Sequence, residues 1–152
     1  MVIRMLINSL LLFIIPWIFG AYLFNTDREL LLSIGPFSSL IAFIFNEWGT
    51  HIGWWSFQPE RFEFLSIFLS NLGIYLVVPC LMVRFIRKRA LNSIAAVIIF
   101  SGLLTLLEFI MFTAERIKYD LGWNMGWTAV SYLLSNSLIT VYFSIWKKVR
   151  KT

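Results

Sequence analysis

One carboxyl group lies inside an otherwise apolar stretch of the chain, and its residue type suits proton transfer. Glu108 comes about two helical turns before Ala114, where the apolar stretch ends, which is roughly 9 Å at 1.5 Å per residue. In a membrane, a carboxylate at this depth costs at least about 2.5 kcal/mol unless it is paired, hydrated or protonated. We therefore predict that Glu108 faces other helices. It would act either as a proton donor or counter-charge for a ligand, or only as a carboxyl that holds helices together.

Polar residues at helical spacing accompany this carboxyl on two segments. The first stripe consists of Ser101, Thr105, Glu108 and Glu115, and the second of Asn124, Thr128, Ser131 and Ser135. Residues three, four or seven apart share one face of a helix. Two facing stripes would supply hydroxyl and amide groups to the carboxyl, although such residues also serve as ordinary polar contacts between packed helices.

A second set of chemically capable residues lies in the central loop, residues 46–60, which reads NEWGTHIGWWSFQPE. Glu47 and His51, the only histidine, are four residues apart and would share a helix face. This spacing favours a hydrogen-bonded pair for general acid–base catalysis. Because there is no second histidine and only one cysteine, we expect no metal site and no cofactor.

Aromatic and polar residues of this loop and of a later loop form a candidate ligand-binding set. Its members are Trp54, Trp55, Glu60, Tyr119, Trp123, Asn124 and Trp127. Tryptophans at the ends of apolar segments are typical of an interfacial aromatic belt. They could equally form the walls of a cleft for a lipophilic or cationic ligand. With Glu108, Glu47 and His51 as the candidate catalytic residues, this set completes the predicted site.

Composition determines which elements must position these residues. Of the 152 residues, 59% are hydrophobic and 14% are charged, with a mean hydropathy of +0.79. Soluble domains carry about 25% charged residues, so lipid is the expected solvent. The apolar runs are continuous rather than alternating, which predicts helices and not a barrel. We predict a single domain, 1–152, that is an all-α integral membrane protein: a bundle of about five transmembrane helices over residues 5–24, 30–45, 64–83, 91–114 and 124–146.

Two features of the predicted spans leave room for variation. The first span begins like a signal peptide, but its length and the lack of an A-x-A pattern predict a helix of the mature protein, kinked at Pro16. The second span is short and contains Gly35-Pro36. It either extends into residues 46–48 or starts in the membrane interface.

Lysine and arginine residues predict the orientation. Four lie on the amino-terminal side of the five spans: Arg4, Arg61, Arg116 and Lys118. Nine lie on the other side: Arg28, Arg84, Arg87, Lys88, Arg89, Lys147, Lys148, Arg150 and Lys151. The positive-inside rule then predicts a multi-pass membrane protein with the amino terminus outside and the carboxyl terminus cytoplasmic. The net charge of +5 is accordingly assigned to topology and to the lipid bilayer, not to nucleic acid.

The order of several short motifs resembles an uncharacterised family of short polytopic membrane proteins from Gram-positive, spore-forming bacteria. The motifs are Trp54-Trp55-Ser56-Phe57-Gln58-Pro59-Glu60, Val78-Pro79-Cys80, the span with Glu108, and Tyr119-x-x-Gly122-Trp123-Asn124-x-Gly126-Trp127. The resemblance runs from Asn46 to the tail. It implies the fold and a location in a bacterial cell membrane, and it implies no activity.

A more distant resemblance is to the membrane lycopene cyclase domains of carotenoid synthesis. Their W-x-F-x-P-E segment is similar to Trp55 through Glu60. Those domains follow it with a Pro-x-Glu-Glu motif in the next span, whereas this chain has Leu69-Ser-Asn-Leu72 there, without a carboxylate. Protonation of an alkene needs a positioned acid, so Glu108 would have to replace that motif from a different helix.

Two functions fit these features. The first is an outward-facing aromatic and polar cleft around Glu108 that binds a lipophilic ligand and, if it is catalytic, transfers a proton to an isoprenoid-like or lipid substrate. The second is a non-enzymatic accessory subunit that docks a membrane-protein partner or a second copy of itself. A small transporter is a weaker alternative, because five spans do not divide into two symmetric halves.

Overall fold

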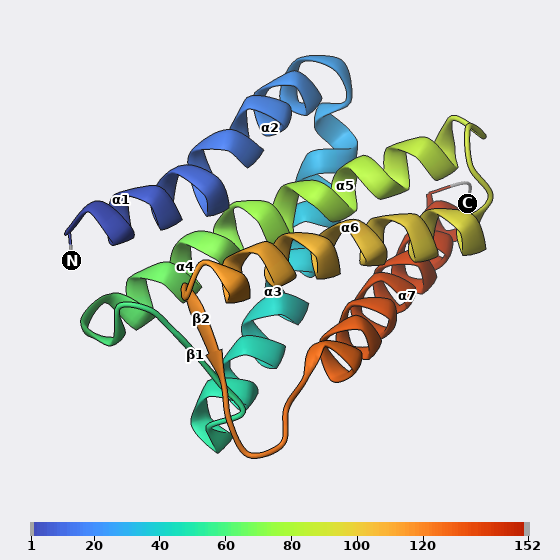
Figure 1. Cartoon of the computed structure of the whole chain (residues 1–152). Coiled ribbons are helices and arrows are strands. Elements are labelled where there is room, and N and C mark those ends of the chain that lie inside the picture. The colour runs from blue at the N-terminus through green and yellow to red at the C-terminus, as the bar shows by residue number, and fades with distance from the viewer. Residues whose placement is uncertain (1, 151–152) are drawn as a thin grey trace.

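The computed structural model describes residues 2–150. Met1, Lys151 and Thr152 lie outside the described residues, so Lys151 of the predicted basic tail is not placed. Five helical segments are long and apolar enough to cross a membrane: Ile3–Thr26, Arg28–Ile52, Glu60–Arg87, Ser93–Thr113 and Met125–Val149. They confirm the predicted all-α integral membrane fold with five spanning segments (Figure 1).

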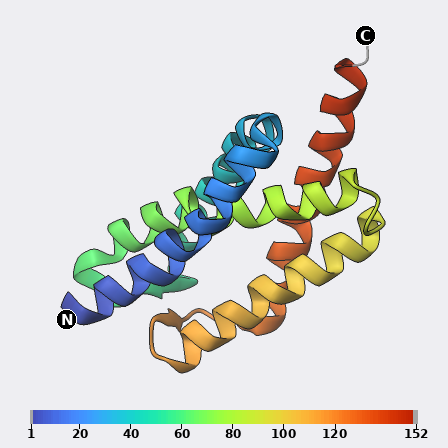
Figure 2. The same cartoon turned by 90° about the horizontal axis from the view of Figure 1, so that it is seen from above.

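Several of these segments are composite. The helices are α1 (Val2–Ser9), α2 (Ile15–Thr26), α3 (Arg28–Ile52), α4 (Glu63–Leu72), α5 (Ile74–Arg87), α6 (Ser93–Thr113) and α7 (Met125–Val149). A π-helical turn, Leu10–Ile14, joins α1 to α2, and a 3-10 turn, Glu60–Phe62, precedes α4. In Figure 2, α1 and α2 run alongside α4 and α5, while the carboxyl-terminal half of α7 projects beyond the other helices.

The second span is longer than its apolar run. Helix α3 continues through Asn46 and Trp48 to Ile52, so the alternative in which the span takes in residues 46–48 is the correct one. Pro36 lies inside this helix without ending it. The helix ends at Gly53, whose φ of +85° is accessible to glycine at little cost. The extension moves Glu47 and His51 out of the loop and onto a helix.

The first and third spans are both interrupted where they meet. The π-helical turn ends two residues before Pro16, the position predicted to distort the helix. Opposite this turn, Gly73 separates α4 from α5, and a Cβ atom at Gly73 would collide with the carbonyl oxygen of Leu12. Trp17 donates a hydrogen bond of 2.9 Å to the Leu72 carbonyl, which the break between the helices leaves without a helical partner. The two irregularities therefore fit each other.

The two loops predicted to share one face pair as a small antiparallel sheet. Strand β1 (Trp55–Phe57) pairs with β2 (Ile117–Tyr119), with Trp55 opposite Tyr119 and Phe57 opposite Ile117. Backbone hydrogen bonds extend the pairing on both sides, from Gln58 to Arg116 and from Asp120 to Trp54. This sheet closes one end of the bundle, where β2 follows α6 and precedes α7 (Figure 1).

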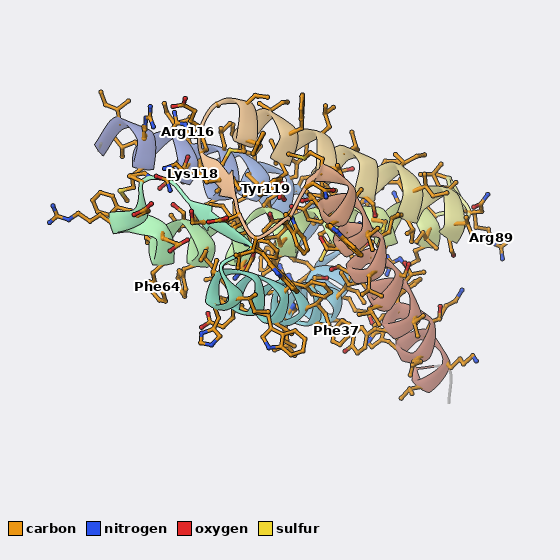
Figure 3. The ribbon with its side chains drawn as sticks, turned by 60° about the horizontal axis from the view of Figure 1, so that its bottom comes forward. Phe37, Phe64, Arg89, Arg116, Lys118 and Tyr119 are labelled. Atoms are coloured by element: carbon orange, nitrogen blue, oxygen red, sulfur yellow. The ribbon has the colours of Figure 1, made fainter. Side chains whose placement is uncertain are left out.

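Charge separates the two ends of the bundle. Figure 3 shows Arg116 and Lys118 at the end that carries the sheet and Arg89, in the α5–α6 turn, at the opposite end. Among the described residues, eight basic residues and two acidic ones, Asp27 and Glu29, belong to the Arg89 end. We call the end with Arg89 the basic end, and the end with Arg116 and Lys118 the sheet end.

The contact between the two interrupted spans predicts an asymmetric effect of adding a methyl group. Gly73→Ala should lower the free energy of unfolding by about 1–3 kcal/mol, because its Cβ meets a backbone oxygen that cannot rotate away. Gly102→Ala in α6 is the matched control, since no atom lies within 4 Å of its added Cβ. Thermal melting of both variants in one detergent measures the difference. Equal melting temperatures would show that the close contact is absent.

Candidate functional site

A narrow cavity runs from the sheet into the bundle. The space that the centre of a water molecule can occupy in it is about 60 Å³. This is room for about four waters at roughly 15 Å³ each. The lining residues are Ser38, Ile41, Ala42, Phe45 and Asn46 of α3, Trp55 and Phe57 of β1, Tyr75 and Pro79 of α5, Leu104 and Glu108 of α6, Ile117 of β2, Trp123, and Thr128, Ser131, Tyr132, Ser135, Asn136 and Ile139 of α7. We call this cavity the slot.

The slot is long, and its two long sides differ in polarity. Along α7 the lining extends from Thr128 to Ile139, about 16 Å at 1.5 Å per residue. That side presents mostly hydroxyl and amide side chains, whereas the α3 side presents Ile41, Ala42 and Phe45, with Ser38 and Asn46 at its two ends. A molecule in the slot would therefore meet mainly polar groups along one edge, and apolar groups along the middle of the other.

Hydroxyl groups from a strand and a helix surround the carboxyl of Glu108. Tyr119 of β2 and Thr128 of α7 both bond to Oε1, the latter at 3.2 Å. Tyr132, one turn further along α7, donates to Oε2. We call these four residues the Glu108 cluster. A carboxylate without such donors would be strongly unfavourable inside hydrocarbon, so the cluster explains how the charge is accommodated.

The hydrogen-bond chain beyond the cluster ends at the slot. The hydroxyl groups of Tyr132 and Tyr75 lie 2.8 Å apart, and either can be the donor. When Glu108 is ionised, Tyr132 donates to the carboxylate and Tyr75 donates to Tyr132. When Glu108 is protonated, the chain can reverse, and Tyr75 then directs its proton into the slot. The ordering of this chain is thus linked to the protonation state of the carboxyl.

Three tryptophans cover the cluster on the sheet side. The ring centroids of Trp54 and Trp123 are 4.9 Å apart and those of Trp55 and Trp123 are 4.7 Å apart. We call these three residues the aromatic lid. Trp123 also donates from Nε1 to Thr128 Oγ1 at 2.9 Å, which connects the lid to the Glu108 cluster. Gly49 of α3 lies under Trp55, where an added Cβ would overlap the indole ring.

Tyr119 is held as a hydrogen-bond donor. Burial, and next the negative charge of Glu108, raise the pKa of Tyr119 well above its ordinary value of 10.0. Its ring also stacks on Phe112, with centroids 4.9 Å apart. The phenol therefore stays protonated near neutral pH and can donate to the carboxyl. The β1–β2 pairing fixes the strand that carries it.

The structure brings together only part of the predicted site set. Glu108, Trp55 and Trp123 line the slot, Tyr119 bonds to Glu108, and Trp54 stacks on Trp123. These residues come from α6, β1, β2 and the loops that flank the strands. The predicted convergence of Glu108 and the tryptophans at one end of the bundle agrees with this geometry.

The other predicted site residues lie elsewhere. Glu47 and His51 are exposed on the last turns of α3, with no hydrogen bond between them and no place in the slot lining. Asn124 caps α7, accepting from the backbone N–H groups of Gly126 and Trp127. Trp127 is 56% exposed. Glu60, also exposed, accepts only a 3.4 Å hydrogen bond from Gln58. The described residues contain no group of three or more metal-ligating side chains.

Two tyrosines of the hydrogen-bond chain were absent from the predicted set. Tyr132 follows Ser131 of the polar stripe, and Tyr75 lies in the apolar third span. Both phenols are inside membrane-spanning helices, where a hydroxyl needs a partner. That requirement was the available signal, but it could not show that the partner was Glu108.

Comparisons with protein-family models, with curated proteins and with solved structures found no match.

Replacing Glu108 should separate charge from hydrogen bonding. Glu108→Leu removes the acceptor of three hydroxyl groups, which can only partly pair with one another. We expect it to lower the free energy of unfolding by about 1–3 kcal/mol, the usual cost of unsatisfied buried groups. Glu108→Gln keeps an acceptor and should lose less. Denaturation of both in the same detergent, with exposed Glu115→Gln as the control, tests this. A Gln variant as unstable as Leu would contradict the donor arrangement.

The lid can be displaced without changing any of its residues. Gly49→Ala should push the Trp55 ring away from its present position, because the new Cβ overlaps it. We expect acrylamide to quench tryptophan fluorescence more strongly in this variant, compared in a background where exposed Trp48 and Trp127 are phenylalanine. Gly102→Ala should leave the quenching unchanged. Unaltered quenching in Gly49→Ala would mean that Trp55 does not pack on α3.

Proposed function

We propose that this chain is a multi-pass bacterial plasma-membrane protein whose slot binds a slender lipophilic molecule, with the ligand's polar head at the Glu108 cluster. The observation that carries this proposal is a carboxyl held by three hydroxyl groups at the lining of a long cavity. Intramembrane ionisable groups are kept despite their cost mainly where they have a function. The aromatic lid would shield the head group from water.

The shape of the slot limits the class of ligand. The slot has a volume of about 60 Å³. A linear chain fits a cavity of this size, whereas a fused ring system would fit only if the helices separated. The apolar edge on α3 suits an acyl or isoprenoid chain. The polar edge on α7 suits oxygen or nitrogen atoms along or at the end of that chain. A slender amphipathic molecule satisfies both edges.

The chain from Glu108 through Tyr132 to Tyr75 supports a chemical role in addition to binding. A head group that donates a hydrogen bond to Tyr75 favours the ionised carboxyl, and one that accepts favours the protonated carboxyl. If the protein is catalytic, proton transfer to or from the ligand would use this chain. Such a step would be similar to the protonation that the resemblance to membrane lycopene cyclase domains implies, with Glu108 in place of their acid motif.

The orientation belongs to the same proposal. Eight basic residues among those described at one end, against four at the other, favour the sheet end outside and the basic end in the cytoplasm. The slot would then open toward the outer face, beneath the paired strands. Membership of the resembled family of Gram-positive bacteria would be consistent with this placement.

Native mass spectrometry with co-purified lipids tests the proposal directly. Wild-type protein released from mild detergent should carry a bound lipophilic molecule in defined stoichiometry. Glu108→Gln should lose most of that occupancy while it folds and melts near the wild-type temperature. Glu115→Gln, whose carboxylate is exposed at the same end, should retain it.

The same experiment discriminates the alternative function. An accessory subunit predicts no retained small molecule and instead a protein complex whose assembly, not ligand content, fails in Glu108→Gln. Wild-type protein that is free of ligand and purifies with a membrane-protein partner would replace our proposal with that one.

A further inference from the structure

Away from the slot, the basic end contains a buried guanidinium group. Arg84 of α5 is only 8% exposed. Its Nη1 donates to Thr26 Oγ1 and its Nη2 donates to the Tyr22 hydroxyl at 3.2 Å, and its charge lies 4.9 Å from the centre of the Tyr22 ring. Among the described residues, no carboxylate oxygen lies within 4 Å of it. Both of its hydrogen-bond partners are neutral.

A second guanidinium approaches the same turn. Arg87 lies one helical turn after Arg84 on the same face of α5. It forms an ion pair of 2.7 Å with Asp27, whose side chain is 3% exposed, at the junction of α2 and α3. The contact is not aligned as a hydrogen bond, since that oxygen has no hydrogen-bond partner in the described part of the chain. Asp27 thus pairs with Arg87, and Arg84 has no carboxylate partner among the described residues.

This local charge is not balanced by the protein. A buried cation is costly unless an anion accompanies it. A guanidinium has five N–H donors, and the described residues supply Arg84 with only two acceptors. Exposed Lys88 and Arg89 follow in the turn after α5 and add further positive charge. The missing component is an anion that fits a fork of N–H groups.

The location indicates which anion. Arg84 lies three residues before the end of Glu60–Arg87, a segment that is long and apolar enough to cross a membrane. A side chain at the end of such a segment is expected close to the layer of lipid head groups. Beside it, the ring of Tyr22 of α2 is 53% exposed. Two residues further along α2, the 42% exposed ring of Phe24 carries Arg28 at 4.3 Å. Exposed rings with cationic groups next to them suit a lipid that offers acyl chains and a phosphate together.

We propose that Arg84, together with Arg87 and Lys88, forms a site for the phosphodiester head group of an anionic phospholipid. Arg84 supplies paired N–H donors to the phosphate oxygens, as guanidinium groups commonly do. The lipid supplies the charge that the protein lacks, and its acyl chains lie against the aromatic residues of α2. This site is separate from the slot and does not depend on what the slot binds.

Native mass spectrometry with added lipid tests this site. Phosphatidylglycerol should bind wild-type protein in detergent about tenfold more tightly than phosphatidylcholine, which carries the same phosphodiester without net charge. Arg84→Gln should lose about tenfold in phosphatidylglycerol affinity. Lys118→Gln, an exposed lysine at the sheet end, is the matched control and should bind as wild type does.

Two further measurements cover folding and the source of the anion. Arg84→Lys keeps the charge, and so protects folding, but removes the fork, and it should weaken binding several-fold. Inorganic phosphate at millimolar concentration should neither bind measurably nor displace the lipid, because it lacks acyl chains. Wild-type affinity for phosphatidylglycerol in both Arg84 variants, or full displacement of the lipid by inorganic phosphate, would overturn the proposal.

Discussion

A carboxylate inside a membrane must be given hydrogen-bond donors, and most of the organisation at the sheet end follows from this requirement. The donors of Glu108 come from β2 and from two turns of α7, which must all approach one point on α6. Helix α6 itself cannot supply these donors. Thr105, one turn before Glu108, already donates its hydroxyl to the backbone carbonyl of Ser101. The loop between α6 and α7 is therefore not a plain connection.

The small sheet fixes the positions from which these donors reach Glu108. A three-residue strand is too short to be stable alone, but β1 and β2 rest on buried Phe57 and Ile117, which pack with Leu104 and Met111 of α6. With that register fixed, Tyr119 points to Glu108 and Trp55 lies over Gly49. The same pairing brings Trp54 and Trp55 to Trp123. Acid cluster and aromatic lid are thus two results of one strand pairing.

The sequence was sufficient for the fold class, because long apolar runs in a lipid solvent leave helices as the remaining choice. It also indicated Glu108 and the polar stripes, since helical spacing is a local property. It could not indicate the β1–β2 pairing, in which the two strands are separated by two helical spans. The expected Glu47–His51 pair was a local inference of the same kind as the stripes, but α3 places both side chains on its exposed side. Local spacing shows which residues share a face and not which way that face points.

The two ends of the bundle handle buried charge in different ways. At the sheet end, Glu108 is surrounded by protein hydroxyl groups, and the arrangement is complete within the chain while still bordering a cavity. At the basic end, Arg84 has two hydroxyl partners and no carboxylate among the described residues, and it lies next to the exposed ring of Tyr22. A charge that is fully partnered can change its protonation as the chain of hydroxyl groups reverses. A charge that is only half partnered instead favours association with an outside anion, and in a membrane the nearest abundant one is a phosphate of the surrounding lipid.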